Sequence, residues 1–214
     1  MALDFYHGHG SPYSWRVWLA LELKQVPYNL TILSFQNEDT KKPEFVAINP
    51  RHTVPTIVDD GFALWESMAI LEYLDERFAA GAKLYPGDLK ARARIRRLAR
   101  EMEQYLGGPI DKIVDELFWK GDAPPDKGKI EAERQLVKAD LEYFAKELRG
   151  NFVAGDAPCA ADFVLAPYLG YVSRIDVRKP ETKLTELVPP ALAAYRKRVE
   201  ALPYYDKTYP AHWR

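Results

Sequence analysis

Residues 54–67, which read VPTIVDDGFALWES, decide the fold. Two short apolar strands, Thr56–Val58 and Phe62–Trp65, are expected on either side of Asp60-Gly61, a dipeptide that favours a tight hairpin turn. An amphipathic helix is expected to follow over Glu66–Phe78. A proline before one strand and a serine at a helix start turn backbone groups outward at two adjacent places. The stretch therefore suits a short, extended, charged ligand such as a peptide.

The chain before this hairpin predicts a βαβ unit. Leu3–Tyr6 is a candidate strand, and Ser11 is placed to cap a helix whose first position is Pro12. Tyr28–Leu33 alternates apolar and polar residues, so a second strand is expected there, parallel to the first. A short helix is expected over Pro43–Ile48.

The resulting order β-α-β-α-β-β-α is that of a thioredoxin-like α/β domain, predicted to span residues 1–78. Residues 79–88 contain glycine and proline and are interpreted as a linker. Residues 89–214 are predicted to form an all-α helical domain. Its expected amphipathic helices lie near residues 95–117, 130–148 and 191–202, and 163–172 is apolar nearly all round, as in a buried helix.

Composition narrows the class of protein. The chain has 214 residues, of which 47% are hydrophobic, and a net charge of -1. That balance predicts no general affinity for nucleic acid or anionic membranes, and the arginine-rich segment 90–100 is interpreted as a solvated or subunit-facing helix side. The single cysteine, Cys159, favours a reducing compartment. We find no signal-peptide pattern and no spanning segment, so a cytoplasmic protein is expected.

Four motifs resemble those of the cytosolic glutathione S-transferases. They are Ser11–Val17, Asn49-Pro50 followed by Val54-Pro55, Glu66-Ser67, and the segment from Phe152 to Asp162. The resemblance covers nearly the whole chain, and the first motif is most similar to the serine-type tau, theta and zeta groups. It implies glutathione as co-substrate, conjugation to small hydrophobic electrophiles in detoxification, and a homodimer.

Two positions depart from the family pattern. Cys159 stands where relatives usually carry Ser or Thr as the helix cap three residues before Asp162, so the helix is expected to start less firmly. Thr53 stands where relatives often carry Lys or Gln before Val-Pro.

Ser11 is the candidate catalytic residue because its hydroxyl could donate to the glutathione sulfur and favour the thiolate. Lowering a thiol pKa by about 2 units takes roughly 2.7 kcal/mol. A neutral hydrogen bond supplies about 1 kcal/mol, and the positive end of the helix about 0.3–1 kcal/mol. Ser11 as a helix cap only is the plain alternative. Tyr6, Tyr13 and Ser14 are rival donors.

The remaining glutathione contacts follow from the resemblance. Pro55 is expected in the cis form, which would expose the backbone of Val54 to the cysteinyl part of the tripeptide. Glu66 would meet the γ-glutamyl ammonium group, and Ser67 at the helix start would hold its carboxylate. An ordinary strand-starting proline and simple capping of the helix dipole are the alternatives.

Other candidate residues carry weaker arguments. Lys41 and His52 could reach the glycyl carboxylate, although a solvated lysine and a loop histidine fit as well. His7 and His9 lack further ligands at useful spacing, so no metal is expected. The electrophile pocket is expected between the two halves of the chain, and its candidate lining residues are Tyr13, Phe35, Tyr105 and Trp119.

The sequence thus predicts a glutathione transferase, with peroxidase activity as a further expectation. Two alternatives stay open. One is a non-catalytic protein that binds glutathione or hydrophobic ligands, and the other is a specialised glutathione-dependent isomerase or dehalogenase.

Overall fold

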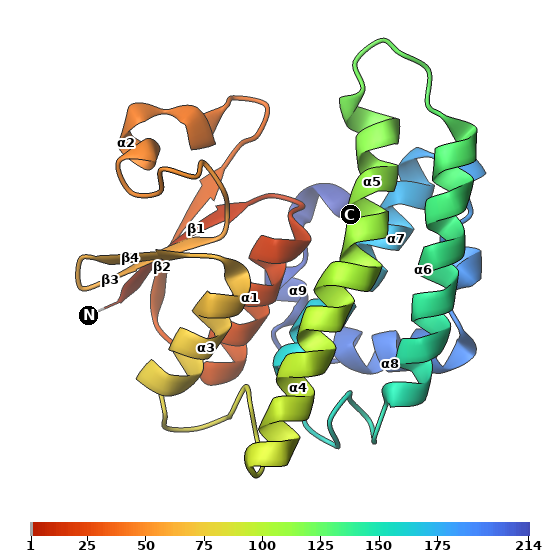
Figure 1. The fold of residues 1–214 in the computed structure, drawn as a ribbon. Coiled ribbons are helices and arrows are strands. Elements are labelled where there is room, and N and C mark those ends of the chain that lie inside the picture. The colour runs from red at the N-terminus through yellow and green to blue at the C-terminus, as the bar shows by residue number, and fades with distance from the viewer. Residues whose placement is uncertain (1) are drawn as a thin grey trace. The chain divides into compact units, whose positions relative to one another are not determined.

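The protein is described here by a computed structural model that covers residues 2–214. The chain forms two compact units (Figure 1). Unit 1 contains the chain up to Pro86 together with Leu202–Arg214, and unit 2 is Gly87–Ala201. Residues 79–86, expected as a linker, group with unit 1, and so do the last residues, which were expected in the helical domain.

Unit 1 is built on a four-stranded mixed sheet. Its strands are β1 (Leu3–Gly8), β2 (Tyr28–Leu33), β3 (Thr56–Asp59) and β4 (Phe62–Trp65). They lie in the order β2-β1-β3-β4. As predicted, β1 and β2 are parallel, whereas β3 runs antiparallel to both β1 and β4. The thioredoxin-like fold is confirmed.

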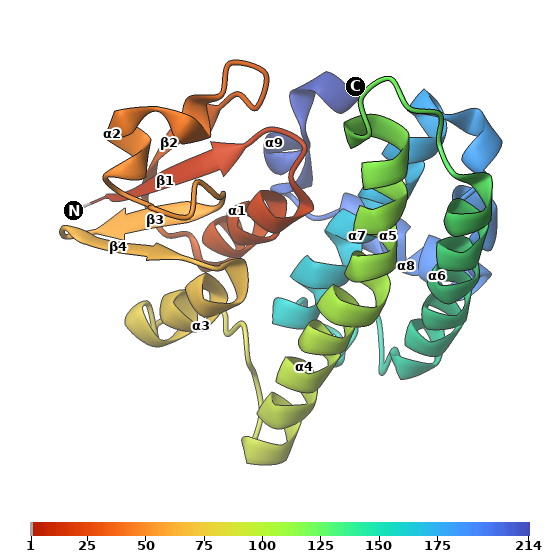
Figure 2. The same cartoon turned by 45° about the horizontal axis from the view of Figure 1, so that its top comes forward.

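Helices cover both faces of this sheet (Figure 2). The helices α1 (Pro12–Lys24) and α3 (Ser67–Arg77) lie on one face, and the short α2 (Pro43–Val46) lies on the other. Successive side chains of a strand point to opposite faces. Accordingly, the buried ring of His7 contacts Trp18 of α1, while Tyr6 contacts Phe45 of α2.

The C-terminal segment packs against α1. It contains α9 (Tyr205–Thr208) and the 3₁₀ turn η6 (Ala211–Trp213). The buried indole N–H of Trp15 donates to Thr208 Oγ1 at 3.1 Å. This bond ties the end of the chain to the first helix of unit 1.

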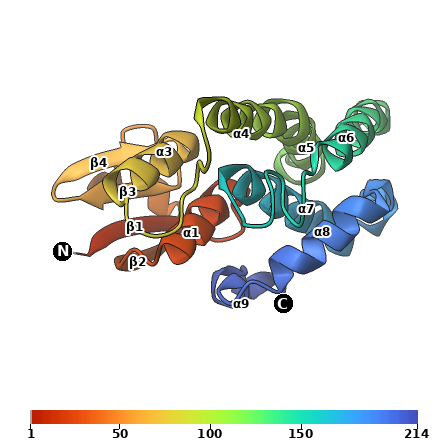
Figure 3. The same ribbon diagram turned by 90° about the horizontal axis from the view of Figure 1, so that it is seen from below.

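Unit 2 is all helical. Its helices are α4 (Leu89–Glu101), α5 (Gly108–Val114), α6 (Lys127–Glu147), α7 (Ala160–Arg178) and α8 (Pro190–Glu200). Two π-helical segments, η2 (Met102–Gly107) and η3 (Asp115–Trp119), continue the run from α4 through α5. Within unit 2, α7 lies in the middle of the bundle (Figure 3), and its residues 160–170 are buried throughout. Short 3₁₀ turns η1 (Asp39–Lys41), η4 (Pro180–Thr182) and η5 (Thr185–Leu187) complete the described elements.

The start of α7 is held by a buried carboxylate. Asp162 accepts hydrogen bonds from the N–H of Val153 at 2.9 Å and from that of Cys159 at 2.8 Å. Burial raises the pKa of Asp162 to about 6. The helix begins directly after Cys159, so Asp162 closes this end from inside the helix although the cap residue is a cysteine.

Across residues 2–214, no helix combines the length and the apolar character that crossing a bilayer would require.

Candidate functional site

Ser11 lies where β1 gives way to α1. Its Oγ accepts a hydrogen bond from the N–H of Ser14 at 3.2 Å, so it caps the helix as predicted. The side chain is half-buried. Because Oγ acts as acceptor in this bond, its hydrogen stays available to a ligand at the positive end of α1.

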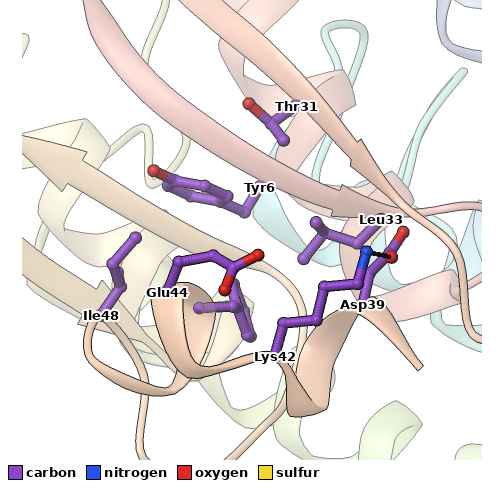
Figure 4. A pocket seen from close by; sticks show the side chains of 8 residues that line it. Tyr6, Thr31, Leu33, Asp39, Lys42, Glu44 and Ile48 are labelled. Carbon is purple, nitrogen blue, oxygen red and sulfur yellow. Dashed lines mark ion pairs between the residues drawn. The ribbon is translucent and has the colours of Figure 1, made fainter. Parts of the chain in front are cut away.

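The rival hydroxyl groups differ from Ser11 in burial or in the contacts that they make. Ser14 is fully buried, and its Oγ accepts from the N–H of Gly8 at 3.2 Å. Tyr6 lies on the opposite face of the sheet from α1, where it lines a pocket of about 340 Å³ beneath α2 (Figure 4). Burial raises the pKa of this phenol, with Asp4 adding to the effect. The ring of Tyr13 stacks with the guanidinium of Arg16, whose carbon is 4.8 Å from the ring centre.

Val54 and Pro55 stand immediately before β3. The peptide bond between them is cis, as the sequence predicted. Val54 is half-exposed, and its methyl group lies over Gly8: a Cβ on Gly8 would come within 2.5 Å of Val54 Cγ2. The same Cβ would come within 2.7 Å of the Phe35 ring. Val54 and Phe35 therefore meet over the end of β1, and only glycine at position 8 allows this approach.

A buried amide braces the loop that carries Val54. Asn49 is fully buried, and its Nδ2 donates to the carbonyl oxygen of Thr53 and to Thr56 Oγ1, each at 2.9 Å. Its Oδ1 accepts from the N–H of Arg51 at 2.9 Å. Sequence reasoning identified Asn49-Pro50 as a motif but assigned Asn49 no role.

Glu66 and Ser67 open α3, and the backbone of Glu66 has an unusual conformation. Its φ is 67°, in the left-handed region that non-glycine residues rarely adopt. Such backbone strain gathers at ligand sites. Glu66 is exposed, whereas Ser67 is buried.

An arginine lies directly behind Ser67. Arg16 of α1 is fully buried, and its Nη1 donates to Ser67 Oγ at 3.1 Å. The Ser67 oxygen thus accepts from a cation, which leaves its own hydrogen to point toward an anion at the helix start. Sequence reasoning missed Arg16, because a single arginine on a helix gives no signal of burial.

His52 contacts the backbone of Thr40, the residue before Lys41. His52 Nδ1 lies 3.2 Å from the carbonyl oxygen of Thr40, which can only accept, so Nδ1 carries a hydrogen in this bond. His52 has φ 57°, a second left-handed non-glycine residue near Val54. Lys41 forms an exposed ion pair with Glu38.

Two family models match parts of this chain. The N-terminal domain model of the glutathione S-transferases matches residues 10–77, and the C-terminal domain model of the same family matches residues 128–198. The chain belongs to the glutathione S-transferase superfamily. Membership implies glutathione as the co-substrate.

Solved glutathione transferases have the same fold. Glutathione transferase F1 of poplar is 24% identical, with a TM-score of 0.82 over 97% of this chain and 96% of that one. A glutathione S-transferase of the Antarctic clam Laternula elliptica is 26% identical, with a TM-score of 0.82 over 100% of this chain and 94% of that one. Isozyme E7 of Drosophila melanogaster is 27% identical, with a TM-score of 0.79 over 99% and 91%.

We expect Ser67→Ala to weaken glutathione binding about tenfold, because an anion at the start of α3 would lose one charge-assisted hydrogen bond. Turnover at saturating glutathione should change little, since the bond serves binding. Calorimetric affinity and a separation of KM from kcat would show this. Ser34→Ala, at a half-buried position whose Oγ accepts from the N–H of Asn37, is the control. Unchanged affinity in the Ser67 variant would remove Ser67 from the site.

The predicted electrophile residues lie in both units. Tyr13 and Phe35 belong to unit 1, whereas Tyr105 and Trp119 belong to the π-helical segments of unit 2. The side chains of Tyr105 and Trp119 are 51% and 70% exposed, which leaves their rings open to a ligand. Their grouping with Tyr13 and Phe35 in one pocket stays a prediction. The part of the chain from residue 2 onward holds no cluster of three His, Cys, Asp or Glu residues suited to a metal.

Proposed function

We propose that this glutathione S-transferase family member conjugates glutathione to small hydrophobic electrophiles, with Ser11 as the residue that activates the thiol. The observation that carries the proposal is the hydroxyl of Ser11, which caps α1 as an acceptor and keeps its hydrogen for the sulfur. Ser14 is fully buried, and Tyr6 packs against Phe45 on the face of the sheet opposite α1. This supports a serine-type enzyme.

The glutathione contacts are proposed as follows. The backbone of Val54, beside Pro55, pairs with the cysteinyl part of the tripeptide. Glu66 takes its ammonium group and Ser67 its γ-glutamyl carboxylate, while Lys41 or His52 takes the glycyl carboxylate. Two residues of this set, His52 and Glu66, have positive φ angles. Backbone strain of this kind is common at ligand sites, which supports the proposed contacts.

Ser11→Ala should lower conjugation of a chloronitrobenzene-type substrate at least tenfold, about 1.4 kcal/mol, while glutathione still binds. The reason is that the sulfur would lose its hydroxyl donor but keep its backbone partners. Steady-state kinetics and calorimetry on the same preparation would measure both. Unchanged turnover would move the role to Tyr13.

Peroxidase activity toward organic peroxides needs the same thiolate and is proposed with it. We also propose a homodimer in the cytoplasm, for which light scattering provides the check on assembly. A glutathione-binding protein without turnover on a broad electrophile panel would instead fit the non-catalytic alternative.

A further inference from the structure

The pocket of about 340 Å³ beneath α2 is not used by the proposed function (Figure 4). Residues of β1 and β2 form one side of it, and residues of the segment 39–48 form the other. All of them belong to unit 1. None is among the proposed glutathione contacts. A volume of this size suits a small organic molecule, so the side chains that line the pocket indicate which kind of molecule it would take.

Two aromatic rings meet in this pocket. The ring centres of Tyr6 and Phe45 are 5.7 Å apart, and the rings are inclined at 59° to each other. Leu33 and Ile48 add apolar contacts around them. Burial raises the pKa of Tyr6, so its phenol stays protonated and neutral. The face of an aromatic ring attracts an organic cation within about 6 Å, and the apolar neighbours suit the hydrocarbon body of such a ligand.

Two of the charged side chains in the lining neutralise each other. Lys42 Nζ lies 2.6 Å from Asp39 Oδ1, the ion pair that is drawn as a dashed line in Figure 4. The other carboxylate oxygen of Asp39 accepts from the N–H of Ser34 at 2.8 Å. Asp39 and Lys42 therefore give the pocket no net charge.

Glu44 is the remaining charged residue of the lining. It is exposed in the first turn of α2. Across residues 2–214 its carboxylate forms no ion pair, and it raises the pKa of Lys42 less than Asp39 does. Asp4 lies on the same side of β1 as Tyr6 and adds a second negative charge, which contributes to the raised pKa of Tyr6. These charges favour a cation over an anion in the pocket.

We propose that this pocket is a second ligand site, which binds a small organic ammonium ion with an apolar body. The body rests on the rings of Tyr6 and Phe45, and the ammonium group faces the carboxylate of Glu44. Ring faces and carboxylate attract the same charge, so the site distinguishes an amine from an alcohol or an acid of the same shape. Because the site shares no residue with the proposed glutathione contacts, it stands apart from the proposed function.

The test is a titration of the ¹⁵N-labelled protein with 2-phenylethylamine, followed by amide chemical shifts. We expect saturable shifts at residues 31–33 and 42–48. The uncharged 2-phenylethanol should bind about fivefold more weakly, because it lacks the cation. The anion 3-phenylpropionate should bind more weakly still. Equal affinity for amine and alcohol, or saturable shifts only outside these two segments, would overturn the proposal.

Three variants connect the binding to named side chains. Glu44→Gln should weaken the amine about threefold, because it removes an exposed carboxylate partner. Thr31→Trp should abolish binding of amine and alcohol alike, since Thr31 is an exposed lining residue and the larger ring would fill the pocket. Glu76→Gln is the matched control: Glu76 is exposed on α3, at the other face of the sheet, and its loss should leave the affinity unchanged. Circular dichroism checks that each variant is folded.

Further outcomes separate this site from the proposed glutathione site. Saturating S-methylglutathione should leave the affinity for 2-phenylethylamine unchanged. Displacement of the amine, with its shifts at Ser67 instead, would place it among the proposed glutathione contacts and overturn the second site. Wild-type affinity in a folded Glu44→Gln or Thr31→Trp variant would overturn it as well. Failure to bind S-methylglutathione would count against the proposed function alone.

Discussion

Replacing Asp162 by alanine should lower the free energy of unfolding by about 3 kcal/mol at pH 8. The carboxylate is fully buried and accepts from two backbone N–H groups, those of Val153 and Cys159. Each orphaned buried donor costs about 1–3 kcal/mol, which gives about 2–6 kcal/mol for the two. Relief of a buried charge offsets part of this cost. Urea unfolding measures the difference.

The pH dependence of that difference identifies the cause. Burial raises the pKa of Asp162 to about 6, above the ordinary value of 3.8, so the folded state binds this proton more tightly. The stability gained from that proton is fully present below about pH 4 and is lost as the pH rises through 6. The alanine variant lacks this term. The wild type should therefore exceed the variant by about 1.4 kcal/mol more at pH 5 than at pH 8.

Asp156→Ala is the matched control, because Asp156 is an exposed carboxylate in the same loop and accepts from the N–H of Asn151 at 3.3 Å. It should cost less than about 1 kcal/mol. A difference for Asp162→Ala that is equally small, or that is the same at both pH values, would show that the carboxylate does not hold the start of α7.

Local sequence patterns predicted the elements of unit 1 well. The hairpin over β3 and β4 follows from Asp60-Gly61 between two apolar runs, and the cap at Ser11 follows from a serine before Pro12. In each case the deciding residues lie within a few positions of one another. The Val54-Pro55 motif was identified in addition, by its resemblance to the glutathione S-transferase family.

Features set by long-range packing were not predicted. Arg16 meets Ser67 from 51 positions away in the chain, so nothing near Arg16 signals its burial. The last residues pack on unit 1 through Trp15 and Thr208, which are 193 positions apart. Apolar spacing also cannot separate a π-helical turn from an α-helical one, so η2 and η3 were expected as ordinary helix.

The expectation about Cys159 shows how a local rule is overridden. A cysteine is a poor cap acceptor, so a weak start of α7 was expected. The structure satisfies the N–H of Cys159 with the Asp162 carboxylate and leaves the thiol buried, where burial raises its pKa. Both halves of the capping box form: the Cys159 side chain accepts from the N–H of Asp162, and the Asp162 carboxylate accepts from the N–H of Cys159.

The second large effect is expected at Asn49. Asn49→Ala should destabilise unit 1 by about 2–4 kcal/mol, because it removes a fully buried amide and its bonds to Thr53 and Thr56. Thermal or urea unfolding measures this cost. Asn37→Ala is the control, since Asn37 lies exposed in the loop before η1.

The same variant tests whether the Asn49 amide only stabilises the fold or also positions Val54 for glutathione. Asn49 holds the loop on both sides of Val54 through Arg51 and Thr56. If the Val54 backbone pairs with glutathione, loosening this loop should weaken glutathione at least tenfold under conditions where the variant is still folded. Calorimetry at low temperature, with circular dichroism on the same sample, provides the measurement. Wild-type affinity in a folded but destabilised variant would mean that glutathione does not depend on the position of Val54, and the proposed cradle would have to be placed elsewhere.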